Sequence, residues 1–320
     1  MAQKKEFYYP SSDGKTEIHA VVWKPETGVC RGVFQIVHGM MEFIDRYGGL
    51  AEFLTERGYL VAGHDHLGHG KSVRYEEDLG YIAEKRGSDC LVADMHRMRA
   101  LLQKKYPELP YFMMGHSMGS YLLRKYLTVH GEKLSGALIL GTGSVPGGIV
   151  LIGTAMARTL AFFKGWRYRS PLMERAFFSG DYRKFDMDGS HPEKSWLSRD
   201  TKVVKEYYSN PGCTFRFTLN GFYSVLKTVH YDNQMKYTEK IPKNLPIIMM
   251  SGAQDPVGGL GKGVRRAEAQ LRKAGIRDLT CVLYPEDRHE ILNEMDKEQV
   301  YQDIADWCER IIQEKGQREQ

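Results

Sequence analysis

Gly115-His116-Ser117-Met118-Gly119 is the stretch of sequence that decides the fold. It follows an apolar run, Tyr111 to Met114, and precedes a helix-like stretch, Tyr121 to Val129. A G-x-S-x-G pentapeptide between a strand and a helix predicts a tight turn that presents the serine at its tip. The two glycines allow the backbone and the helix to approach without a Cβ clash. We therefore interpret Ser117 as a candidate nucleophile.

Two downstream residues stand in the order that a serine nucleophile requires. Its hydroxyl needs a base that removes the proton and a third group that holds the base. Asp255 follows the apolar run Ile247 to Met250, and His289 follows the apolar strand Leu279 to Leu283. Because loops after parallel strands emerge at one edge of a sheet, this order predicts a Ser117–His289–Asp255 triad. Taken singly, Asp255 also fits a helix N-cap or a turn, and His289 a surface loop.

An early strand predicts the second part of the same site. A tetrahedral oxyanion is stabilised by two backbone N–H donors. Met118, directly after Ser117, is expected to supply one, and Met40, after the apolar strand that ends at His38-Gly39, the other. His38 precedes the nucleophile in the chain, and its place before Gly39 favours a role in bracing this loop.

Four segments together resemble the lysophospholipase and monoacylglycerol lipase-like group of serine α/β-hydrolases, often labelled serine aminopeptidase-like. The segments are His38-Gly39-Met40-Met41-Glu42 with Arg46-Tyr47, His64 to Ser72, Gly115 to Gly119, and Ser251 to Val257 with Arg288-His289-Glu290. They extend over almost the whole chain. The resemblance implies Ser117 as nucleophile, Asp255 as acid, His289 as base, and the Met40 and Met118 amides as oxyanion hole. It also implies an α/β-hydrolase fold, in which a mostly parallel central sheet is flanked by helices and carries an inserted, mainly helical cap.

The chain departs from this group beside the predicted oxyanion loop. Met41 stands where the group usually has glycine, and Phe43 stands where it often has histidine. A bulky Met41 would narrow or re-line an acyl pocket. We expect Met41, Phe43, His116 and Val257 to contact the substrate.

The order of strand-like and helix-like segments predicts the domain organisation. Residues 1–142 and 241–320 alternate between the two and are expected to form the hydrolase core. Residues 143–240 are rich in aromatic residues and methionine, which predicts the inserted cap. Within them, Ile149 to Phe163 has an apolar face that fits either an acyl pocket or the packing of the cap itself. Arg199 and Asp200 are interpreted as a structural pair.

Composition narrows the class of protein. The chain has 320 residues, 42% of them hydrophobic, and its net charge of +5 is spread out. This supports a sizeable folded core and no nucleic-acid partner. The five cysteines are widely spaced, predict no metal site and fit a reducing compartment; they are Cys30, Cys90, Cys213, Cys281 and Cys308. With no signal-peptide pattern at the N-terminus, we expect a cytoplasmic protein with at most peripheral membrane contact.

The function expected from these features is hydrolysis of a lipid-like monoester, a monoacylglycerol or a lysophospholipid, without metal or organic cofactor. Three alternatives stay open. One is an esterase for short or aromatic acyl groups, and another is a non-catalytic ligand receptor. The third is an aminopeptidase, which needs a carboxylate for the substrate's ammonium group; the candidates are Glu174, Asp181, Asp186 and Glu206. The sequence does not predict an oligomeric state.

Overall fold

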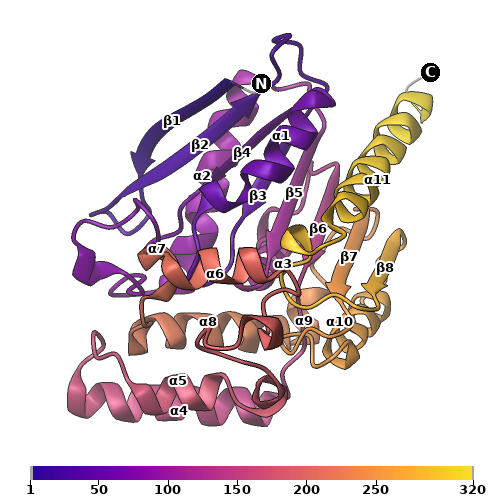
Figure 1. Cartoon of the computed structure of the whole chain (residues 1–320). Helices are drawn as coiled ribbons and strands as arrows, with labels where there is room; N and C mark the ends of the chain where they lie inside the picture. The colour runs from indigo at the N-terminus through magenta and orange to yellow at the C-terminus, as the bar shows by residue number, and fades with distance from the viewer. Residues whose placement is uncertain (1–2, 319–320) are drawn as a thin grey trace.

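An eight-stranded sheet forms the centre of the computed structural model, which describes residues 3–318 (Figure 1). Its spatial order is β1-β2-β4-β3-β5-β6-β7-β8. The hairpin of β1 (Gln3–Pro10) and β2 (Glu17–Lys24) is antiparallel, and β2 is antiparallel to β4 (Tyr59–His64). The other strand pairs are parallel. The remaining strands are β3 (Gly32–Val37), β5 (Tyr111–His116), β6 (Gly136–Leu140), β7 (Ile247–Gly252) and β8 (Leu279–Tyr284).

The central strands are almost entirely apolar because both faces of the sheet are covered. Every residue of β3 to β7 is buried, as expected for strands with helices on either side. Alternate side chains enter two separate cores. In β5, Met113 packs with Met95 and Leu122 on one face, while Phe112 and Met114 pack on the other.

Helices of the core cover both faces of this sheet (Figure 1). One face carries α2 (Gly87–Lys105), α3 (Met118–His130) and α10 (Lys262–Lys273). The other carries α1 (Gly48–Glu56) and α11 (Lys297–Arg318). Short 3-10 turns lie at Ile44–Tyr47, Glu76–Asp78 and Ile291–Asn293. The predicted α/β-hydrolase architecture is therefore the observed one.

Between β6 and β7 the chain is helical, and we call residues 143–240 the helical insertion. Its helices stack beneath the sheet in Figure 1, with α8 packed between α4 on one side and α2 and α3 on the other. The elements are α4 (Gly147–Lys164), α5 (Pro171–Phe177), α6 (Thr201–Ser209), α7 (Pro211–Thr214), α8 (Leu219–Asp232) and α9 (Met235–Thr238), with 3-10 turns at Gly180–Lys184 and Pro192–Lys194. The predicted boundaries of this segment as a separate cap stay a prediction.

Helix α4 leaves much of its apolar surface uncovered. Val150, Ala157 and Ala161 are buried, whereas Ile152 is 72% and Phe162 84% exposed. By length and composition alone, this helix could also cross a membrane. Its 18 residues correspond to about 27 Å, slightly less than the hydrocarbon thickness of a bilayer.

Candidate active site

Ser117 lies in a strained turn between β5 and α3. Its backbone angles, φ 53° and ψ −121°, lie outside the helical and strand regions. The turn is held by the Ser117 amide, which donates to the carbonyl of Leu140 at 3.0 Å. Gly119 makes the turn possible, because a Cβ there would overlap the carbonyl oxygen of Val37. The local sequence thus forces the serine outward, as the pentapeptide predicts.

His289 and Asp255 meet at the carboxyl edge of the sheet. His289 Nδ1 lies 3.0 Å from Asp255 Oδ2, and both side chains are buried. The amide of Val257 donates to the other carboxylate oxygen at 2.8 Å, which fixes the orientation of Asp255. The ring of Trp196, from the helical insertion, stacks on the His289 imidazole with centroids 5.0 Å apart.

The loop after β3 brings a second set of amides beside Ser117. A Cβ on Gly39 would lie 2.5 Å from Glu42 Oε1 and 3.0 Å from the Ser117 Cβ, so glycine allows this close approach. Within residues 3–318, no protein group accepts a hydrogen bond from the amides of Met40 or Met118. His38 braces the loop as predicted: its Nε2 accepts from the His66 amide at 2.9 Å.

Met41 adopts a backbone conformation that favours glycine. Its φ of 56° lies in the left-handed region, which costs an L-residue about 1–2 kcal/mol. This is the position where the lysophospholipase and monoacylglycerol lipase-like group, which the sequence resembles, usually has glycine. The methionine therefore keeps the glycine-type turn and adds a side chain to the cavity wall.

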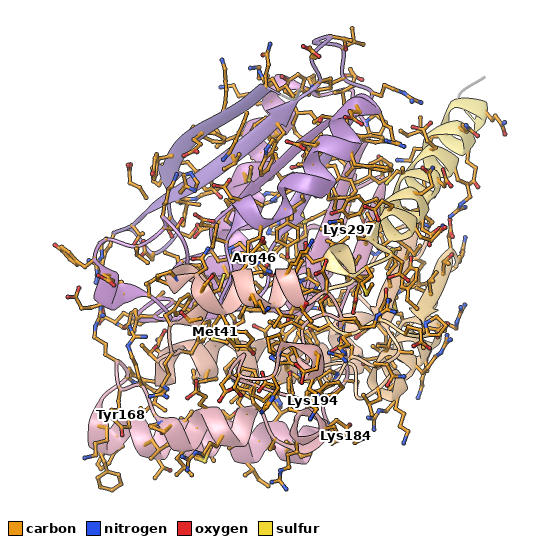
Figure 2. The ribbon with its side chains drawn as sticks, in the orientation of Figure 1. Met41, Arg46, Tyr168, Lys184, Lys194 and Lys297 are labelled. Atoms are coloured by element: carbon orange, nitrogen blue, oxygen red, sulfur yellow. The ribbon has the colours of Figure 1, made fainter. Side chains whose placement is uncertain are left out.

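A buried charge network connects the loop after β3 to the loop after β8, which carries His289 and which we call the histidine loop. Arg46 donates two parallel hydrogen bonds to Glu290, each 2.7 Å long, and a third to Glu42 at 3.1 Å. Such a bidentate pair is both strong and directional. Arg46 also lies over the ring of Tyr207 on α6, where the core meets the helical insertion (Figure 2).

Glu42 and His116 stabilise each other's charged forms. Burial disfavours the Glu42 carboxylate, but His116 and Arg46 outweigh it and hold its pKa well below the usual range. Burial likewise disfavours a charged His116, but the hydrogen bond and charge of Glu42 raise its pKa. His116 Nε2 lies 3.2 Å from the carbonyl oxygen of His289, so the network reaches the predicted base.

Most of these residues line a cavity of about 460 Å³. Ser117, His289, Met40 and Met118 line it, and Asp255 lies behind His289. Apolar side chains of the helical insertion form much of its wall, among them Val150, Met156, Phe177 and Leu226. A larger hollow of about 650 Å³ lies elsewhere and has none of the three predicted catalytic residues in its lining, so we assign the substrate to the smaller cavity.

Three of the four predicted substrate contacts line the cavity, and the fourth does not. Met41, His116 and Val257 line the cavity. Phe43 does not: it packs against the apolar cluster around Tyr207 and lies close to Gly212.

Comparison with known proteins places the chain in a family. Residues 28–296 match the family described as Serine aminopeptidase, S33. The chain belongs to this family. It is 25% identical to the monoacylglycerol lipase of Mycolicibacterium smegmatis over 89% of this chain and 90% of that protein. It is 26% identical to the monoglyceride lipase of Saccharomyces cerevisiae, with 95% and 93% of the two chains covered.

Solved structures share this architecture over nearly the whole chain. A thermostable carboxyl esterase from Bacillus coagulans, in complex with glycerol, superposes with a TM-score of 0.88 at 29% identity and covers 97% of this chain and 99% of its own. A lipase in an open form has a TM-score of 0.86 at 24% identity, with 97% and 99% covered, which shows the fold. The resemblance and the fold predicted from the sequence are both confirmed.

Proposed function

We propose that this carboxylic ester hydrolase cleaves a lipid-like monoester, a monoacylglycerol or a lysophospholipid, through an acyl-enzyme on Ser117. The observation that carries the proposal is the largely apolar cavity with Ser117 and His289 in its wall. An apolar cavity of this size binds an acyl chain by removing its surface from water. The monoacylglycerol and monoglyceride lipases among the relatives support the same substrate class.

The reaction has two steps in this proposal. His289 removes the Ser117 proton as the hydroxyl attacks the ester carbonyl, and then protonates the leaving alcohol. Water, activated by the same imidazole, hydrolyses the acyl-enzyme. Asp255 holds the histidine and stabilises its charged form. The unpaired amides of Met40 and Met118 stabilise the oxyanion, a contribution worth about 10²- to 10³-fold in turnover for each donor.

The surface of the helical insertion supports a lipid substrate. Ile149 and Ile152 on α4 line the cavity and are also exposed, so apolar surface continues from the cavity wall to the outside of the molecule. In our proposal residues 143–240 act as a cap, and α4 rests peripherally on a lipid surface while the acyl chain enters beside it. The position of Phe162 and Phe163, both exposed, extends this surface along the helix.

Aminopeptidase activity is the second candidate, because the family carries that description and one of the four acids considered for an ammonium group reaches the cavity. Of the four acids considered, only Asp181 lines it. Glu174 instead pairs with Arg216, and Glu206 is exposed. Since Asp181 itself pairs with Lys184 at 3.0 Å, it is a weaker anchor for an ammonium group than a free carboxylate.

The test is a panel of p-nitrophenyl esters from acetate to palmitate, with amino-acid anilides, a monoacylglycerol and a lysophospholipid beside it. Ser117→Ala is the control in every assay. We expect Ser117-dependent hydrolysis that favours medium or long chains. A preference for anilides would replace the lipid proposal with the peptidase, and activity confined to acetate would indicate a short-chain esterase. A wild-type protein inert toward a serine-directed phosphonate would indicate a non-catalytic receptor.

A further inference from the structure

One segment of the helical insertion pairs directly with the loop that carries His289. The His289 amide donates to the carbonyl of Trp196 at 3.3 Å, and the Glu290 amide donates to the carbonyl of Leu197 at 2.7 Å. Ser198 Oγ donates to the carbonyl of Asn293 at 3.0 Å. Together with the Trp196 ring stacked on the imidazole, these bonds make residues 193–200 a strap across the histidine loop.

Arginine side chains fasten the strap from both sides. Arg288, next to His289, donates to the backbone carbonyls of Glu193, Ser195 and Ser198. Arg199, on the strap, donates from Nη2 to Asp287 Oδ1 at 2.6 Å and to Asp296 Oδ1 at 2.9 Å.

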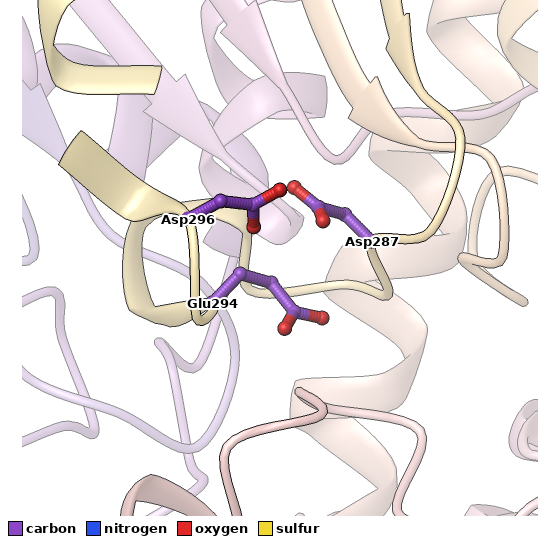
Figure 3. Close-up of side chains that lie close together, drawn as sticks. All are labelled: Asp287, Glu294 and Asp296. Carbon is purple, nitrogen blue, oxygen red and sulfur yellow. The ribbon is translucent and has the colours of Figure 1, made fainter. Parts of the chain in front are cut away.

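Glu294 completes the contacts of Arg199. Its Oε2 accepts from the backbone amide of Arg199 at 3.0 Å and from Nε at 3.2 Å. Figure 3 shows the carboxylates of Asp287, Glu294 and Asp296 gathered at this point. Arg199 thus contacts acids on both sides of His289 in the chain.

Arg199 is the cation that pairs with all three acids of this cluster. Asp287 and Glu294 are buried, and Asp287 Oδ2 has no hydrogen-bond partner among the described residues. Burial, followed by the charges of Glu294 and Asp296, raises the pKa of Asp287 to about 7. Both oxygens of Glu294 already accept N–H groups, from Arg199 and Arg288, so the cluster offers a metal few free ligands.

We propose that Arg199 is a positioning residue for His289: by bridging the acids of the 287–296 loop to the strap, it holds the imidazole in the orientation that activates Ser117. Without it, the carboxylates repel one another and the loop keeps only its backbone contacts and those of Arg288 and Ser198 to the strap. The inference rests on the proposed role of His289 and not on the lipid substrate. A displacement of about 1 Å at a catalytic group can cost about 10²-fold in rate.

The experiment compares Arg199→Ala, Arg199→Lys and Arg216→Ala with the wild type. Arg216 is the matched control because it pairs with Glu174 within the helical insertion, in an ion pair that does not include the histidine loop. The readouts are kcat and KM for p-nitrophenyl acetate and butyrate, the rate of Ser117 labelling by a small phosphonate, and folding by circular dichroism.

We expect Arg199→Ala to lower kcat and the labelling rate in parallel by about 10²-fold, with KM within about twofold. Lysine should restore part of the rate because it keeps the charge but not the fork of donors. Millimolar guanidinium should stimulate Arg199→Ala and leave Arg216→Ala unchanged. A folded Arg199→Ala with wild-type kcat and labelling would overturn the proposal, as would an equal loss in Arg216→Ala.

If Arg199→Ala does not fold, Glu294→Gln alone and combined with Arg199→Lys tests the same contact. Because Glu294→Gln and Arg199→Lys weaken the same ion pair, their effects on kcat should be markedly non-additive. Additive losses, or a lower melting temperature with unchanged kcat, would contradict positioning. A wild type that resists the phosphonate would instead refute the role of Ser117, which separates failure of this inference from failure of the proposed function.

Discussion

Replacing Glu42 with glutamine removes a charge that four donors share in the interior. Its carboxylate accepts from the Gly39 amide at 2.5 Å, from Tyr47 Oη at 2.8 Å and from Arg46 Nη1 at 3.1 Å. His116 Nδ1 is the fourth, at 3.3 Å. Glutamine has the same shape, but its amide nitrogen would face a guanidinium or amide donor. We expect both stability and turnover to fall.

The loss of stability in Glu42→Gln depends on which hydrogen bonds the partners of Glu42 retain. Removing one partner of a buried ion pair costs about 3–5 kcal/mol. Arg46 retains its two bonds to Glu290, so we expect the lower end, about 3 kcal/mol. At about 2 °C per kcal/mol for a chain of this length, the melting temperature should fall by about 6 °C. Turnover should fall by about 10²-fold if, as we propose, the Met40 amide next to Gly39 stabilises the oxyanion.

Calorimetry and p-nitrophenyl butyrate hydrolysis measure the two effects. Glu309→Gln is the control: Glu309 also accepts from an arginine and a tyrosine, Arg31 and Tyr59, but neither of these partners lines the cavity. It should lower the melting temperature slightly and leave kcat unchanged. A Glu42→Gln protein with a melting temperature within about 1 °C of wild type and unaltered kcat would refute the reasoning.

Three further changes test other parts of the structure. Met41→Gly relieves about 1 kcal/mol of backbone strain and offsets it with a freer unfolded chain, so stability should hardly change while the ester panel shifts toward bulkier acyl groups; an unchanged profile would contradict this. Gly119→Ala should destabilise by about 1–3 kcal/mol and lower kcat, measured by urea unfolding and ester hydrolysis, because its Cβ meets backbone atoms of Val37 and His38; full activity would disprove the close approach. Burial lowers the pKa values of His64 and His69 to about 3, so each histidine should cost about 2 kcal/mol of stability as pH falls from 7 to 5, because only the unfolded chain takes up its proton there. Asp232 and Asp287, whose pKa values burial raises to about 7, take up protons in the folded state over the same range and oppose this loss, so the test is a single variant: urea unfolding of His64→Gln should lose about 2 kcal/mol less between pH 7 and 5 than the wild type, and an equal pH dependence would rule this out.

Local sequence was enough to predict the elements that position the site. Gly58, a residue type typical of a helix C-terminus, follows α1 (Gly48–Glu56) closely in the sequence and has φ 85° in the structure. The strands and the turn at Ser117 could also be predicted. A strand buried on both faces requires a continuous apolar run, and the turn requires small residues next to the serine, so both are visible in neighbouring residues. The order of Ser117, Asp255 and His289 predicted which loops meet, and the Asp255–His289 hydrogen bond agrees with it.

Contacts between distant segments could not be read in this way. The interpretation of Arg199 and Asp200 as a pair was wrong: Asp200 caps α6 by accepting from the Lys202 amide, while Arg199 reaches acids about ninety residues further along. Phe43 likewise packs outside the cavity, and nothing in the sequence around Trp196 indicates that it stacks on His289.

The sequence by itself therefore determined the sheet, the elbow and the order of the candidate catalytic residues, since strand burial and turn geometry depend on near neighbours. Only the tertiary structure decided which charges face one another and what covers the histidine. Glu42, Arg46 and Glu290 come from two separated loops, and the strap comes from a third segment. Their meeting depends on how the helical insertion packs on the core, which no local pattern of residues encodes.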